Sequence, residues 1–159
     1  MSTFHFDFSI ADMYIPLANA IQSSTIQPFV ADNAIDGISN TGSRTLHSAN
    51  KWWSVELLKT AKISTIQLFV SLYRIENGYF NQVKVSTRMS EAEKWRVCKD
   101  TFSMGKPNQP HDIHCDRPTT ANYLRIDVYG GKDLRLTEVN ILESMYLLVN
   151  IIPFLNLSG

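Results

Sequence analysis

Oxygen-bearing side chains gather in the segment NAIDGISNTGS, residues 33–43. Asn33, Asp36 and Ser43 offer amide, carboxylate and hydroxyl oxygens, and Gly37 allows the backbone to curl around a small ion. A hard cation such as Ca²⁺ prefers ligands of this kind. The segment lacks the ligand spacing of an EF-hand, so an ordinary polar loop is the alternative that these residues leave open.

A histidine, an arginine and a glutamate form a second candidate group. His47 precedes a tandem tryptophan, while Arg74 and Glu76 follow the apolar segment KISTIQLFV at 62–70. A planar guanidinium held by a carboxylate, with an imidazole nearby, offers fixed donors and acceptors to vicinal sugar hydroxyls. A surface salt bridge and an unrelated histidine are the other interpretation of the same residues.

Catalytic motifs are missing from the sequence. It contains no nucleophile elbow, HExxH pair, phosphate-binding glycine loop or dinucleotide fingerprint. The scattered Asp, Glu and Ser residues show no spacing that singles out a catalytic set. We therefore expect a binding protein and not an enzyme.

The charged residues and the two cysteines further limit the class of protein. The 159 residues include 15 basic and 15 acidic side chains, so the formal net charge is zero, and no run of basic residues exceeds two. A nucleic-acid partner is not expected, because such proteins need clustered Lys and Arg. Cys98 and Cys115 allow one intramolecular pairing, and their spacing alone leaves a disulfide and two free thiols equally open.

Short apolar segments separated by turn residues predict strands at 62–70, 80–87, 122–129 and 134–142. Breakers such as ENG at 76–78 and GGKD at 130–133 lie between them. This pattern is typical of an all-β sandwich or barrel. In the strand that follows His47, alternation predicts Trp53 on the core side with Val55 and Leu57, and Trp52 on the other face as a cover for neighbouring loops.

Several motifs, taken in order, resemble those of F-type lectins, the fucose-binding members of the discoidin or coagulation-factor C-type group. They are NAIDG, a histidine before N-x-WW-x-V-E-L, an R-x-acid step, W-x-x-C with a later C, Y-L-R-I and L-x-L-T-E-V, and they span roughly residues 15 to 143. The resemblance implies a jelly-roll β-sandwich of about eight strands with loops clustered at one end. It also implies fucosylated glycans or glycoproteins as partners and a Cys98–Cys115 disulfide.

The resemblance also assigns a sugar site. The family binds fucose through a histidine, an arginine, an acidic residue and a second basic residue, and His47 and Arg74 match the first two at the family's spacing. Glu76 stands where aspartate is usual. The second basic position falls on Asn81, or on Tyr79 in another alignment, and neither residue is basic. We therefore expect weakened fucose binding.

A structural calcium site carries over from the family as well. Its ligands would be side-chain and carbonyl oxygens that join the first polar loop to the last strand: Asn33, Asp36, Ile38, Ser43, Thr137 and Glu138.

Beyond the lectin-like domain, assigned to residues 1–144, the segment 145–159 is predicted to be an apolar tail too short to span a bilayer. The sequence begins without a signal peptide, yet the resemblance implies a secreted protein. Membrane contact is expected only through glycans or the tail, and self-association stays open. A non-lectin interaction module that uses the same loop tips is the alternative function.

Overall fold

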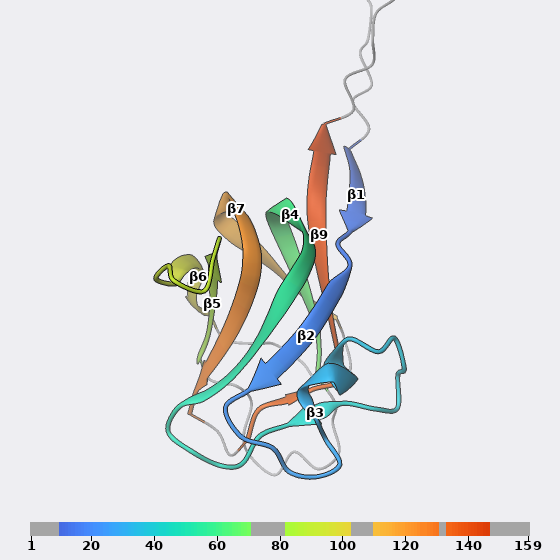
Figure 1. The fold of residues 1–159 in the computed structure, drawn as a ribbon, viewed down its shortest axis with the longest axis vertical. Helices are drawn as coiled ribbons and strands as arrows, with labels where there is room; N and C mark the ends of the chain where they lie inside the picture. The colour runs from blue at the N-terminus through green and yellow to red at the C-terminus, as the bar shows by residue number, and fades with distance from the viewer. Residues whose placement is uncertain (1–9, 71–81, 103–109, 131–132, 147–159) are drawn as a thin grey trace, which may run out of the picture.

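The computed structural model describes residues 10–70, 82–102, 110–130 and 133–146, and most of these residues lie in strands (Figure 1). The prediction of an all-β fold is confirmed. The elements are β1 (Ile10–Tyr14), β2 (Leu17–Gln22), the 3₁₀ helix η1 (Ala31–Ala34), β3 (Ser43–Arg44), β4 (Lys51–Phe69), β5 (Gln82–Arg88), β6 (Arg96–Phe102), β7 (His111–Tyr129), β8 (Arg135–Leu136) and β9 (Glu138–Tyr146).

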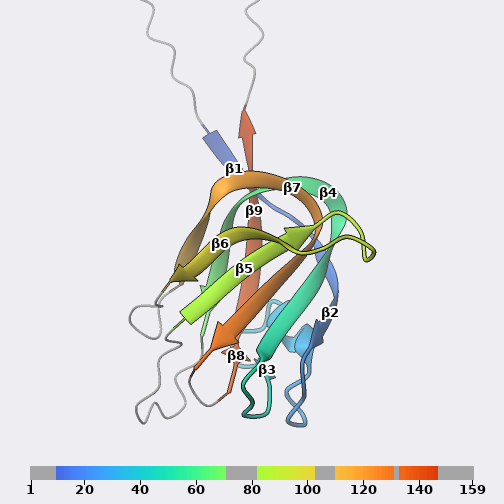
Figure 2. The same cartoon turned by 90° about the vertical axis from the view of Figure 1, so that its left-hand side faces the viewer.

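Two long antiparallel strands, β4 and β7, organise the fold. The first part of β4, which begins at Lys51, pairs with the last part of β7. The second part of β4 pairs with the first part of β7, which begins at His111. The register shifts between Glu56 and Ala61, and again between Ile63 and Thr65. Such bulges bend a strand, so both strands curve over and take part in two layers (Figures 1 and 2).

Each layer is completed by strands that pair with one half of the β4–β7 pair. In one layer, β2 pairs with the first part of β4, while β5 pairs with the last part of β7 and with β6. In the other layer, β9 pairs with the last part of β4 and with β1. The small β3–β8 ribbon lies at the end where β4 begins and β7 ends, and we call this the loop end (Figure 2).

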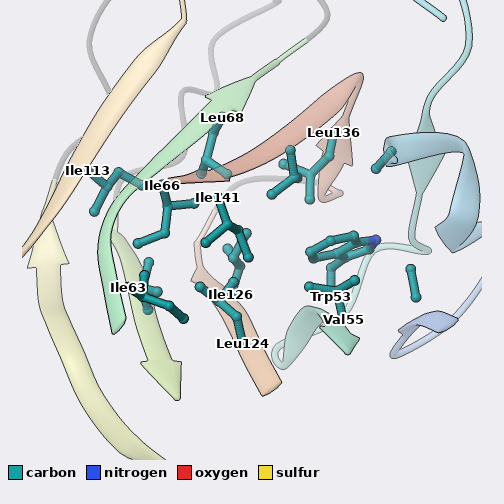
Figure 3. Close-up of a cluster of buried hydrophobic side chains, with 14 of the residues drawn as sticks. Trp53, Val55, Ile63, Ile66, Leu68, Ile113, Leu124, Ile126, Leu136 and Ile141 are labelled. Atoms are coloured by element: carbon teal, nitrogen blue, oxygen red, sulfur yellow. The ribbon is translucent and has the colours of Figure 1, made fainter. Parts of the chain in front are cut away.

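The core fills the space between the two layers. Trp53, Val55 and Leu57 are buried on one side of β4, as their alternation predicts, and the indole Nε1 of Trp53 donates to the carbonyl of Ala31 at 3.0 Å. Ile126 and Ile141 also contribute to this cluster (Figure 3). A tryptophan fully removed from water anchors η1, which contains Asn33, the first residue of the candidate calcium loop.

The expected strand at 134–142 is in fact divided. β8 pairs with β3 and β9 pairs with β4, and the break falls at Thr137, whose amide N–H donates to the carbonyl of Phe69 at 2.7 Å. The buried apolar positions shift phase at this break, from Leu134 and Leu136 to Val139 and Ile141, and this shift is the signal in the sequence for the change of partner. The break matters because it places Thr137 and Glu138 at the loop end.

Residues 147–159, which make up most of the predicted tail, lie outside the described residues. Strand β9 itself continues to Tyr146. Within the described part of the chain, no helix is long and apolar enough to cross a membrane.

Candidate functional site

The predicted calcium ligands and His47 lie at the loop end. His47 lies exposed in the connection between β3 and β4. Arg74, Glu76, Tyr79 and Asn81 lie outside the described residues. The flanks of their segment are nevertheless at this end, because Phe69 pairs with Glu138 and Gln82 pairs with Tyr129.

The loop that carries His47 is fixed on both sides. Before it, the amide of Leu46 donates to Ser24 Oγ at 2.9 Å. After it, the ammonium of Lys51 donates to the carbonyl of Ser48 at 2.7 Å. Lys51 is only 2% exposed, since it occupies a core-facing position at the start of β4. Burial lowers the pKa of Lys51, and the negative charge of Asp133 opposes this shift.

Asp133 also bridges two arginines. Its Oδ2 accepts from Arg44 Nε at 2.5 Å and from Arg135 Nε at 2.8 Å. Partial burial acts to raise the pKa of Asp133, but the hydrogen bonds and charges of Arg135 and Arg44 outweigh it and hold that pKa below its ordinary value. Asp133 is therefore an anion shared by two arginines.

The predicted calcium loop curls around Thr41. The Thr41 hydroxyl donates to Asp36 Oδ2 at 2.7 Å and to the carbonyl of Ile38 at 2.9 Å, and it lies 3.4 Å from the carbonyl of Asn33. Gly37 adopts φ +72°, the left-handed conformation that glycine reaches without strain. These contacts turn the oxygens of the loop toward a common region.

Strand β9 meets this loop through Glu138. The Oε2 atom of Glu138 accepts from the amide of Gly37 at 3.2 Å. Burial raises the pKa of Glu138, the negative charge of Asp36 raises it further, and the Gly37 hydrogen bond acts in the opposite direction. Two carboxylates thus lie near each other at the point where the loop touches the last strand.

Two further predicted ligands, Ser43 and Thr137, lie where the backbones of the polar loop and of β8 pack closely together. Ser43 pairs with Leu136 across the β3–β8 ribbon, and a Cβ atom at Gly42 would approach the Leu136 carbonyl oxygen to 2.9 Å. The hydroxyls of Ser43 and Thr137 are buried and have no hydrogen-bond partner in the described structure. Buried hydroxyls without partners are costly, so they fit a site that takes a cation.

The chemistry of these donors suits a hard cation. No group of three or more His, Cys, Asp or Glu side chains placed to hold a metal occurs among the described residues. The loop instead combines two carboxylates with hydroxyl and carbonyl oxygens, which is the ligand type of Ca²⁺. Sequence reasoning missed Thr41 and Lys51, although a threonine inside the polar loop and a lysine two positions before Trp53 were visible signals.

The predicted disulfide is present. Cys98 in β6 is bonded to Cys115 in the first part of β7, with the two Cα atoms 4.7 Å apart. Disulfides are typical of proteins that fold in oxidising compartments.

Trp52 takes part in a stack of aromatic rings and arginines. It lies on the outer face of β4, as alternation requires, but its ring stacks with the Arg125 guanidinium at 4.5 Å from the ring centroid. Arg125 is held by a bidentate contact with Asp127, and Trp95 extends the stack toward Arg88. The ring of Trp52 therefore covers part of the outer face of the sheet.

Comparisons with known proteins agree with this architecture. The family model of the F5/8 type C domain matches residues 19–138. No curated protein sequence matches the chain.

Among solved structures, a family 32 carbohydrate-binding module of NanJ from C. perfringens, in complex with galactose, has a TM-score of 0.72 at 21% identity. It covers 84% of this chain and 100% of its own. An F5/8 type C domain from Bacteroides fragilis has a TM-score of 0.70 at 16% identity, with 87% and 97% covered. A fucolectin from striped bass (Morone saxatilis) serum has a TM-score of 0.65 at 24% identity, with 79% of this chain and 46% of that chain covered.

Proposed function

Because the chain belongs to the F5/8 type C domain family, we propose that it is a secreted, non-catalytic lectin module that binds fucosylated glycans at its loop end and is stabilised by calcium. The observation that carries the proposal is that residues far apart in the sequence meet there. The loop at 33–43 touches Glu138, and His47 is exposed at the same end. The fold likeness to a fucolectin and to a module in complex with galactose supports the choice of ligand.

In this proposal each sugar-binding residue has a distinct role. The His47 imidazole and the Arg74 guanidinium donate hydrogen bonds to sugar hydroxyls, and Glu76 orients Arg74. Tyr79 or Asn81 replaces the second basic group. A lost charge-assisted hydrogen bond is worth about 1.5–3 kcal/mol, so we expect an affinity about tenfold to a hundredfold below that of a site with two basic groups.

The calcium ion would link the polar loop to the last strand. Asp36 and Glu138 would supply its carboxylates, and Asn33, Ile38, Ser43 and Thr137 would supply neutral oxygens. A bound divalent cation compensates two neighbouring carboxylates and holds the loop in one conformation. The role is structural, because the ion stabilises the loop end on which His47 also lies.

A second candidate function has its own observation. Several apolar side chains are exposed in the loops before and around the calcium loop: Phe29, Val30, Ile38 and Leu46, with 38–52% of their surface accessible. An interaction module that uses these loop tips to contact a protein or a membrane surface would need no sugar site.

A glycan array in calcium buffer tests the first proposal against the second. Fucosides should bind, and His47→Ala and Arg74→Ala should abolish binding. His114→Ala is the matched control, since His114 is an exposed histidine on β7 that contacts Thr65. Silence on all glycans by a folded protein would refute the lectin proposal and favour the interaction module.

Thermal melting tests the ion separately. At a calcium concentration about 100 times its Kd, binding stabilises by about 2.7 kcal/mol, which corresponds to a Tm increase of about 5–10 °C in a domain of this size. Asp36→Asn and Glu138→Gln should remove the increase, whereas Asp112→Asn on β7 should keep it. Identical melts with calcium and with a chelator would refute the site.

A further inference from the structure

The loop between β3 and β4 carries His47 on a stretch of chain with little buried surface. Each of the five residues from Leu46 to Asn50 is exposed. At the start of the loop, the amide of Leu46 donates to Ser24 Oγ at 2.9 Å. A segment with few buried contacts keeps one conformation only where hydrogen bonds fix its backbone. The conformation of this loop therefore depends on a small number of such bonds.

Lys51 supplies the hydrogen bond in the middle of this loop. Its ammonium donates to the carbonyl of Ser48 at 2.7 Å, and Ser48 Oγ in turn donates to the carbonyl of Asn50 at 3.2 Å. A hydrogen bond from a charged donor is stronger than one between neutral groups. Because Ser48 directly follows His47, this bond fixes the backbone next to the imidazole.

The position of Lys51 is unfavourable for an ammonium. Lys51 is 2% exposed, and among the described residues its ammonium makes one hydrogen bond, to Ser48, and no ion pair. Burial lowers the pKa of Lys51 and the charge of Asp133 opposes this shift, but Asp133 pairs with two arginines and not with Lys51. Burying a cation without a paired carboxylate lowers stability. An unbranched apolar side chain such as that of methionine would avoid this cost.

We propose that Lys51 is a positioning residue for the glycan site, which holds the backbone at Ser48 so that His47 faces the ligand in one orientation, at a cost to stability. The inference rests on the proposed lectin function, because His47 is a sugar contact only within that proposal. A loop that already has its binding conformation loses less conformational freedom when the ligand binds, so the affinity is higher. Lys51 acts through the loop and does not touch the ligand, since it is almost fully covered.

Backbone amide NMR relaxation tests the loop without any sugar. The order parameter is about 0.85 for rigid residues and below about 0.6 for flexible ones. In Lys51→Met, His47 and Ser48 should fall from the first range to the second, and Lys51→Arg, which keeps a charged donor, should retain part of the order. Lys62→Met is the matched control and should change nothing, since Lys62 is an exposed lysine on the same strand. Unchanged order parameters in Lys51→Met would overturn the inference.

Glycan binding and thermal melting separate positioning from a general structural role. Lys51→Met should bind fucosides about tenfold more weakly than the wild type, the lower end of the range for one lost hydrogen bond to a charged group. Its melting temperature should stay equal or rise, because the buried charge is gone. A lower melting temperature together with weaker binding would mean that Lys51 stabilises the whole fold, and would overturn the positioning role.

The failure of this inference is distinguishable from the failure of the lectin function. Equal glycan binding by the wild type and Lys51→Met would overturn the inference and leave the lectin function intact. A folded wild-type protein that binds no glycan would overturn the lectin function and, with it, the role of the loop in binding. The order parameters would then still decide whether Lys51 fixes the loop.

Discussion

Stacking of Trp52 on Arg125 should contribute measurably to stability. The guanidinium carbon lies 4.5 Å from the ring centroid, well inside the range for a cation–π contact. Arg125 is 26% exposed, and two serines on the same outer face, Ser54 and Ser86, are only 5% and 3% exposed. Because Ser54 and Ser86 pair with Arg125 on either side of β7, the stacked layer is what shields these serines from water.

The expected coupling energy between Trp52 and Arg125 follows from the partial burial of Arg125. Exposed cation–π pairs are worth about 0.5–1 kcal/mol and desolvated pairs about 2, so a half-buried pair should give about 1 kcal/mol of coupling. Arg125→Met alone should cost more, about 1–2 kcal/mol, because the Asp127 carboxylate also loses its bidentate partner.

A double-mutant cycle isolates the stacking energy. The variants are Trp52→Leu, Arg125→Met and their combination, with free energies of unfolding taken from urea melts. Trp52→Leu combined with Arg96→Met is the control, and its coupling should be close to zero because Arg96 pairs with Glu93 instead. A Trp52–Arg125 coupling below about 0.3 kcal/mol would refute the idea that the outer face is held together by stacking.

Three further sets of substitutions should lower the free energy of unfolding, for reasons that the structure gives. Replacing Cys98 and Cys115 by Ala should lower stability by about 3 kcal/mol, because the bond closes a loop with a sequence separation of 17; thermal melts with and without reductant measure this, and equal melts would contradict it. Trp53→Phe should cost about 2–4 kcal/mol, since it opens a cavity and removes a buried hydrogen bond, and calorimetry that finds a loss below about 1 kcal/mol would show that the site repacks. Hydrogen bonds from the Lys59 ammonium and the amide of residue 62 hold the pKa of Glu143 below 4.5, so its contribution is present above pH 4.5 and is lost as the pH falls through the lowered value. Glu143→Gln should therefore destabilise by about 0.5–1 kcal/mol at pH 7 and by less near pH 3, and a constant difference in urea melts across that range would contradict the assignment.

The sequence predicted the strand content but not the shape of the long strands. Residues 62–70 and the tryptophan strand before them form one element, Lys51–Phe69, because the pairing with β7 is interrupted only by a bulge after Glu56 and resumes at Ala61. Nothing in the pattern of apolar residues marks such a bend, since it depends on which partner strand lies opposite. The break at Thr137 was marked in the sequence, because the apolar positions shift from Leu134 and Leu136 to Val139 and Ile141 where the chain exchanges β3 for β4 as its neighbour.

Local chemistry was easier to anticipate than the contacts between loops. The oxygens of residues 33–43 and the alternation of Trp53, Val55 and Leu57 were readable because each depends on a short stretch of chain. The ion pairs of Asp133 were not, because they join Arg44 to residues 133–135, two segments that only the folded chain brings together. One sequence without a fold cannot show that a carboxylate in GGKD serves an arginine in β3.

Lys51 is a charged residue at a position of β4 where alternation predicts an apolar one. Alternation that places Trp53 and Val55 on the core side also places Lys51 there, and an apolar residue would fill that position at lower cost. The lysine keeps its ammonium under the loop and donates to Ser48, beside His47. A polar residue at a core position is expected where function outweighs stability. The alternation that correctly orients Trp53 therefore also identifies Lys51, two residues earlier, as the side chain that holds the candidate sugar-binding loop in place.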